Sequence, residues 1–234
     1  MPSKEELAIS GFYDGIYNFY GLANSFLTLG LDRWWRARAA GTARESAPGA
    51  LTALDVCCGT GDFSLALKKT FGPRLKLTGA DLSAAMLSAA KVKNPGVNFV
   101  LAGASELPFP DGSFDLVTSS FAARNLNIDR GIMLSALRKF RRALKPGGLF
   151  LNLETTRPKN PALWFFMRTY VKTVIGLLNI LSPKSRGSYS FLKNTILDFY
   201  GADEFSALLS EAGFTGVSCR ILCPGAAAVH TARG

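Results

Sequence analysis

The sequence contains little of what a metal site or a disulfide framework needs. It has one histidine, His230, and four cysteines in 234 residues. The cysteines occur as the neighbours Cys57 and Cys58 and as Cys219 and Cys223, and neither spacing matches a zinc motif. We therefore expect no metal, and we interpret the cysteines as reduced, small core residues of an intracellular protein.

We also expect neither a targeting segment nor a membrane-spanning segment. The first seven residues have neither the apolar core of a signal peptide nor the basic amphipathic pattern of a transit peptide. The most apolar region, around residues 174–181, is shorter than the roughly 20 residues that a bilayer requires. We expect a cytoplasmic protein, and the length with 48% hydrophobic residues favours a single domain.

Acidic side chains are absent from residues 155–197, although the region contains seven lysines and arginines. Aromatic and aliphatic residues alternate with these charges, and the whole chain has a net charge of +10. One interpretation is a lid helix with solvated lysines. The other, which we favour and which is compatible with the first, is peripheral contact with an anionic membrane surface at the inner face of the membrane.

From residue 51 onward, strand-like and helix-like segments alternate. The patterns predict strands at 51–56, 75–80, 97–101, 114–120, 149–153, 217–222 and 226–231, and helices at 63–70, 84–93, 131–144 and 202–213. Such alternation predicts an α/β fold whose mostly parallel sheet has helices on both faces. We divide the single domain into a helical N-terminal extension (1–49, ending in a polar linker at 41–49), a core (50–154), a helical insertion after the fifth strand (155–200) and closing elements (201–234).

A glycine turn follows the first predicted strand. Gly59, Thr60 and Gly61 stand between that strand and a helix, where bare backbone can approach a ligand closely. Asp81 ends the next strand about 20 residues later, at the position where an acidic side chain accepts the hydroxyls of a ribose. Since Ser83 is a good cap for the following helix, ribose binding is the preferred role of Asp81, and Asp55 is interpreted as a residue that orients the turn.

The residues after the turn distinguish between possible nucleosides. Gly61 is followed by Asp62, not by the Lys-Ser/Thr of a P-loop, and an acid there would repel a triphosphate. Ser64 takes the place of the third glycine of a dinucleotide fingerprint. S-adenosylmethionine (SAM) fits better, because its sulfonium and ammonium favour an acidic surround and the turn can hold its carboxylate.

A resemblance to a known family extends over nearly the whole length. The segments that carry it are Tyr13-Asp14-Gly15-Ile16, residues 20–24, 29–35 and 55–62, Asp81-Leu82-Ser83, residues 107–115, Ser120-Phe121-Ala122-Ala123-Arg124-Asn125, residues 189–192, Ala212-Gly213-Phe214 and His230. The chain resembles the ubiquinone/menaquinone biosynthesis C-methyltransferases, which have a Rossmann-like class I methyltransferase fold and methylate a ring carbon of a polyprenylated benzoquinol or naphthoquinol. It departs from the family pattern at Gly21, at Asp32 and at residues 154–158 and 196–201, which are expected on the substrate side.

The resemblance implies roles for particular residues. The implied cofactor-binding residues are Gly59, Thr60, Gly61, Asp81, Leu82, Gly103, Ala104 and Ser120. The implied residues of the methyl-transfer site are Arg124, which would hold the quinol oxygen, with Asn125 and Tyr20. His230 lies in the C-terminal tail, so no general base is obvious, and Tyr20 and Asp62 are considered as partners.

Other functions are compatible with parts of the sequence. A methyltransferase of another hydrophobic small molecule, such as a sterol-like lipid or polyketide, differs only on the substrate side. An RNA methyltransferase, suggested by the pI of about 9.7, is disfavoured because the basic residues are mixed into an apolar insertion, so no nucleic acid is expected. An inactive cofactor-binding scaffold is disfavoured by the intact glycine turn and Asp81. The sequence indicates neither the ring, nor the tail length, nor an oligomeric state.

Overall fold

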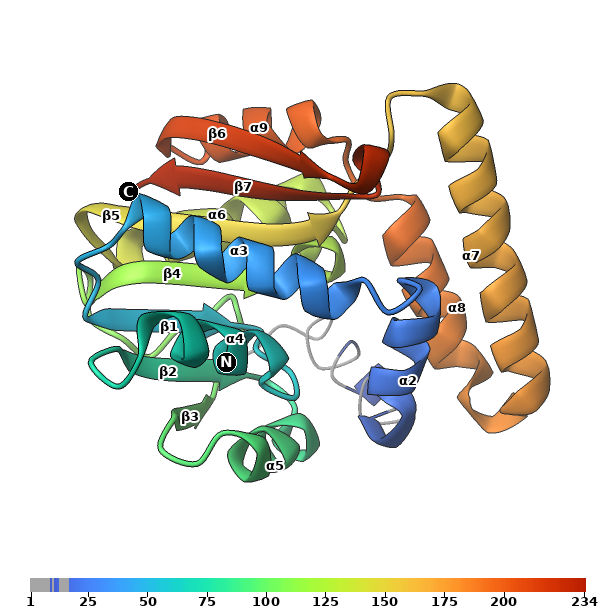
Figure 1. The fold of residues 1–234 in the computed structure, drawn as a ribbon, viewed down its shortest axis with the longest axis horizontal. Coiled ribbons are helices and arrows are strands. Elements are labelled where there is room, and N and C mark those ends of the chain that lie inside the picture. Colours follow the sequence, from blue (N-terminus) through green and yellow to red (C-terminus); the bar gives the residue numbers. More distant parts are fainter. Residues whose placement is uncertain (1–8, 10, 13–16) are drawn as a thin grey trace.

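The computed structural model describes residues 9, 11–12 and 17–234, and its centre is a seven-stranded sheet (Figure 1). The strand order is β3-β2-β1-β4-β5-β7-β6. The strands are β1 (Thr52–Val56), β2 (Lys76–Asp81), β3 (Asn98–Leu101), β4 (Phe114–Ser120), β5 (Leu144–Thr155), β6 (Thr215–Leu222) and β7 (Ala227–Arg233). β7 pairs antiparallel with β5 and β6, while the other pairs are parallel, which confirms the predicted mostly parallel sheet.

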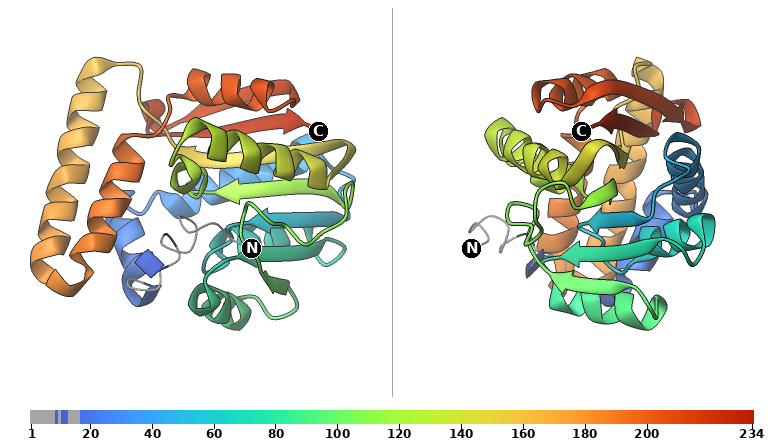
Figure 2. Two further views of the ribbon diagram at one scale, coloured as in Figure 1. Left: turned by 180° about the vertical axis from the view of Figure 1, so that it is seen from behind. Right: turned by 90° about the vertical axis from the view of Figure 1, so that its left-hand side faces the viewer.

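Helices cover both faces of this sheet (Figure 2). One face packs on α3 (Asp32–Ser46) and α4 (Asp62–Phe71), whose buried residues include Ala39, Ala43 and Leu67. The other face packs on α6 (Arg130–Ala143) and α9 (Ala202–Glu211), with Leu137 and Leu208 among the buried residues. α5 (Ala84–Lys93) lies beside β2 and β3. Two apolar layers therefore hold the sheet rigid from both sides.

Two predicted boundaries are wrong, whereas the other predicted bounds of the core elements agree with the structure within two residues. The predicted linker at 41–49 is largely helical, because α3 continues through Gly41 to Ser46. Thr42 and Ala43 are buried, and their packing outweighs the roughly 1 kcal/mol that an interior glycine costs a helix. β5 begins at Leu144, which already pairs with Phe114, so residues 145–148, between the predicted helix and the predicted fifth strand, lie within β5 at an irregularity in the pairing.

A cluster of helices lies beyond the carboxyl ends of the parallel strands (Figure 1). It consists of α2 (Tyr17–Leu27), α7 (Pro161–Leu181) and α8 (Arg186–Leu197), so the insertion is helical as predicted. Val171, Ile175, Tyr189 and Leu192 form a small apolar core between these helices. Ligands of open α/β sheets bind at this end of the strands, and the cluster therefore forms the outer wall of the candidate site.

Candidate active site

Hydrogen bonds join the glycine turn after β1 to the end of β2. The N–H of Gly59 donates to Oδ2 of Asp81 at 2.8 Å, and the N–H of Gly61 donates to the carbonyl of Cys58 at 2.9 Å. The other Asp81 oxygen accepts from the N–H of Ser83 at 2.9 Å. Ser83 itself caps α5 by accepting from the N–H of Met86, as the sequence predicts. Asp81 thus fixes the start of the glycine turn and the segment after β2, and it lines the pocket between them.

Gly61 serves the packing of the turn. Its φ is +73°, and a Cβ at this position would lie 2.5 Å from Nδ2 of Asn94 on the end of α5. The same Nδ2 donates to the carbonyl of Gly61 at 3.1 Å. Glycine is needed here for a close approach of two backbone segments, and Gly61 supports the pocket from outside while Gly59 and Thr60 line it.

Asp55 ties three elements together beneath the turn. Its carboxylate accepts from Oγ of Ser64 on α4 at 2.6 Å and from Oγ1 of Thr118 on β4 at 2.9 Å. Burial raises the pKa of Asp55 to about 6, against these hydrogen bonds, which lower it. Asp55 is 1% exposed and does not line the pocket, so it joins β1, β4 and α4 next to the turn and is not placed to bind a ligand.

A pocket opens where β1, β2, β3 and β4 end. The predicted residues that line it are Gly59, Thr60, Asp81, Leu82, Gly103, Ala104, Ser120 and Asn125. Apolar side chains such as Met86 and Leu126 line its walls, and Ile9 from the N-terminal part closes on it. The pocket thus combines an acid, a glycine-containing backbone turn and apolar side chains, which suits a nucleoside.

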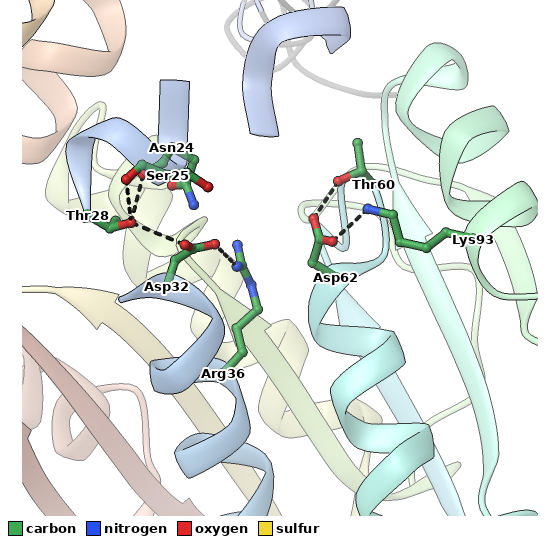
Figure 3. Close-up of polar contacts among 8 residues, drawn as sticks. All are labelled: Asn24, Ser25, Thr28, Asp32, Arg36, Thr60, Asp62 and Lys93. Carbon is green, nitrogen blue, oxygen red and sulfur yellow. Dashed lines mark hydrogen bonds and ion pairs between the residues drawn. The ribbon is translucent and has the colours of Figure 1, made fainter. Parts of the chain in front are cut away.

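The end of the pocket at Thr60 carries both signs of charge (Figure 3). Asp62 accepts from Nζ of Lys93 at 2.6 Å and from Oγ1 of Thr60 at 2.8 Å. Burial opposes ionisation of Asp62, but these two contacts outweigh it and lower its pKa. Arg36 of α3 lines the same pocket. An acid and a guanidinium at one end fit the ammonium and carboxylate of SAM, so the residues present suit this cofactor.

A second, apolar cavity of about 350 Å³ adjoins the first. Its walls come from α2, α3, α7, α8 and the segments after β4 and β6, and include Leu27, Trp35, Leu163, Phe166, Met167, Tyr170, Val171 and Ile196. Phe121 lines both cavities, so its ring is part of the wall between them. Its φ of +54° is unusual for a bulky residue, and such strain at the end of a strand is typical of functional sites.

Arg124 lines the apolar cavity and forms a buried ion pair with Glu154. It lies in a 3₁₀ turn, η1 (Ala123–Leu126), and its Nη1 is 2.6 Å from Oε1 of Glu154. Both side chains are only 2% exposed. Glu154 also accepts two hydrogen bonds from Thr155, from its N–H at 2.8 Å and from the hydroxyl Oγ1 of Thr155 at 3.1 Å, and a third from the N–H of Arg124 at 3.3 Å. This network fixes the guanidinium beside an apolar space, where a charge acts strongly.

Comparison with known proteins identifies the family. A model of the ubiE/COQ5 methyltransferase family matches residues 1–233. The chain belongs to the ubiE/COQ5 methyltransferase family. Demethylmenaquinone methyltransferase of Staphylococcus aureus is 41% identical over 181 residues, which cover 76% of this chain and 73% of that protein.

Solved structures support the fold of this ubiE/COQ5 family member. A SAM-dependent methyltransferase of Thermotoga maritima, described as a possible histamine N-methyltransferase, has a TM-score of 0.67 at 21% identity and covers 95% of this chain and 99% of its own. A SAM-dependent methyltransferase of Aquifex aeolicus has a TM-score of 0.54 at 18% identity, covering 78% and 81%. The chain is a SAM-dependent methyltransferase with the class I fold.

The remaining residues predicted for the methyl-transfer site have different positions. Asn125 lines the cofactor pocket, whereas Arg124 lines the apolar cavity. Tyr20 belongs to α2, but its side chain, like the segment 13–16, lies outside the described residues. His230 is buried in β7, where Nε2 is 2.9 Å from the carbonyl of Ala202, and burial lowers its pKa. This contact with α9 gives His230 a structural role in the methyltransferase.

Three residues of the site were missed by the sequence analysis as functional residues. Phe121 belongs to a segment that carries the family resemblance, and Glu154 to one that departs from it. Their positions, directly after β4 and near the end of β5, are a usable signal. Arg36 had no such signal, because α3 is distant in sequence from the glycine turn. Its place in the pocket follows from the packing of α3 on α4.

Proposed function

We propose that this methyltransferase transfers a methyl group from SAM to a ring carbon of a polyprenylated quinol, a demethylmenaquinol or a polyprenyl-methoxy-benzoquinol, in quinone biosynthesis. The observation that carries the proposal is the apolar cavity beside the cofactor pocket, with a buried arginine in its wall. A prenylated ring is apolar except for its oxygens, and this cavity combines the same features. The relative that methylates demethylmenaquinone supports the same substrate class.

Methyl transfer to a ring carbon requires that the ring of the substrate is electron-rich and that water is excluded from the site. SAM supplies an electrophilic methyl group when it is bound. Arg124 is suited to stabilise negative charge on a quinol oxygen, which raises the electron density of the ring carbon next to it. Glu154 holds the guanidinium at 2.6 Å and prevents it from rotating away. Asn125, on the cofactor side of the same turn, is placed to orient the ring toward the methyl group.

The prenyl tail would leave the site along α7, which points to contact with a membrane surface. Leu163 and Phe166 line the cavity and are also exposed, at 39% and 67%. Further along α7, Leu177, Ile180 and Leu181 are exposed, with Arg168 and Lys172 between the apolar positions. Among the described residues, no helix has the length and apolar character that a membrane span requires. We infer that α7 lies on the surface of an anionic membrane.

A direct assay tests the reaction. Purified protein is incubated with SAM and a reduced short-chain prenyl naphthoquinol or methoxy-benzoquinol, and the products are analysed by mass spectrometry. We expect a gain of one methyl group on the ring of one of the two quinols. A protein that binds SAM but methylates neither quinol, together with a deletion strain that accumulates no demethylated quinone, would overturn the proposal.

Co-sedimentation with vesicles tests the membrane contact. The expected result is pelleting with phosphatidylglycerol-containing vesicles that weakens as salt rises, because screening shortens the range of the charges. The triple variant Phe165→Ser/Ile180→Ser/Leu181→Ser removes three exposed apolar side chains of α7 that do not line the cavity, and it should no longer pellet. Val92→Ser is the matched control, since Val92 is 86% exposed on α5, away from α7. Equal pelleting of the triple variant and the control would contradict a role of α7.

A further inference from the structure

Arg36 is a buried cation that is held by Asp32 and by the ring of Phe121. Its Nη1 forms an ion pair with Oδ2 of Asp32, one helical turn earlier on α3. The other Asp32 oxygen accepts from Oγ1 of Thr28 at 3.2 Å. The guanidinium carbon lies 5.1 Å from the centre of the Phe121 ring. The Arg36 side chain is 9% exposed, so Asp32 and Phe121 leave it little freedom.

The hydrogen-bonding capacity of Arg36 is incompletely used. Nε is buried and has no hydrogen-bond partner within the described part of the chain. A buried donor without a partner is costly, and Arg36 lines the cofactor pocket together with Thr60 and Asp62. Arginine binds carboxylates through two parallel N–H···O bonds. With Nη1 engaged by Asp32, the opposite edge of the guanidinium, which contains Nε, remains for such a contact.

The chemistry at this end of the pocket decides which part of the cofactor Arg36 meets. Placing the ribose at Asp81 leaves the methionine part at Thr60 and Asp62. The N–H groups of Gly59 and Gly61 are already bonded within the protein, and the hydroxyl of Thr60 donates to Asp62. The side chains of Thr60 and Asp62 therefore offer acceptors, which suit the ammonium group. A carboxylate needs donors, and Arg36 provides them across the pocket (Figure 3).

We propose that Arg36 binds the carboxylate of the methionine part of SAM. The N-terminal extension thereby contributes directly to the cofactor site through α3. The proposal rests on the cofactor alone, so it does not depend on which quinol is methylated. Its test needs neither substrate nor turnover.

The experiment compares two ligands by isothermal titration calorimetry. S-adenosylhomocysteine contains the carboxylate, whereas 5′-methylthioadenosine has the same nucleoside and a thioether but lacks the amino-acid part. For Arg36→Met we expect S-adenosylhomocysteine to bind about 10- to 100-fold more weakly, as for the loss of a charged hydrogen bond. The affinity for 5′-methylthioadenosine should stay within twofold of the wild type.

Two further variants complete the test. Arg33→Met is the matched control, because Arg33 is exposed on the same helix and does not line the cofactor pocket; both affinities should be unchanged. Arg36→Lys keeps the charge but loses the two-pronged geometry, so it should show a smaller selective loss, and it decides the question if Arg36→Met does not fold. Equal weakening of both ligands, or unchanged binding of S-adenosylhomocysteine, would overturn the proposal.

Discussion

The buried pair of Arg124 and Glu154 allows stability and catalysis to be separated by mutation. In Arg124→Met, the carboxylate of Glu154 loses its cation at a site that is 2% exposed. Removing one partner of a buried pair costs about 3–5 kcal/mol, which corresponds to a fall in melting temperature of about 6–20 °C for a chain of this length. The loss of a donor to a developing oxyanion should lower kcat about 100- to 1,000-fold.

The double variant Arg124→Met/Glu154→Gln separates the two effects. It leaves no buried charge at the site, and the amide oxygen of Gln can still accept from the N–H of Thr155. We expect most of the lost stability to return, because a buried ion pair contributes little beyond its neutral replacement. The turnover should stay as low as in the single variant, since the guanidinium is still missing.

The assays are thermal unfolding with saturating S-adenosylhomocysteine and kcat at saturating quinol, with the dissociation constant of SAM as a control. Arg124 lines the apolar cavity and not the cofactor pocket, so the affinity for SAM should change little. If activity returned together with stability in the double variant, Arg124 would have only a structural role and the mechanism would be refuted.

Two further predictions concern the glycine turn and its support. Burial disfavours the ionised form of Asp55, so its pKa is about 6 in the folded protein against 3.8 in the unfolded chain. The wild type should therefore lose stability relative to Asp55→Asn as the pH rises from about 4 to 6. The expected loss is on the order of 3 kcal/mol. Urea unfolding of both proteins from pH 4 to 8 measures this, and parallel pH curves would contradict it. Gly61→Ala should lower the melting temperature more than Gly96→Ala: both positions have a positive φ, but only at Gly61 does a Cβ meet Asn94, at 2.5 Å. Thermal unfolding of the two variants tests this, and equal shifts would show that strain alone matters.

Much of the core could be predicted because its signals are local. The apolar run before Gly59, the glycine turn, the cap at Ser83 and the acid at Asp81 each depend on neighbouring residues. The order in which they occur is enough to place them at the same end of a parallel sheet. The boundary of α3 could not be predicted in this way. Gly41 and Thr42 have weak helix propensity, and the burial of Thr42 and Ala43 outweighs it so that α3 continues through them.

The sequence by itself determined the α/β core, the cofactor turn and the presence of a basic, apolar insertion, since these are encoded in periodicity and in short motifs. Tertiary structure alone decided that Arg36 and Arg124 line different cavities. Packing of α3 on α4 brings Arg36 to the cofactor pocket, and pairing of β4 with β5 brings Glu154 to Arg124. Contacts between residues so far apart depend on how helices and strands pack, and no local pattern records that.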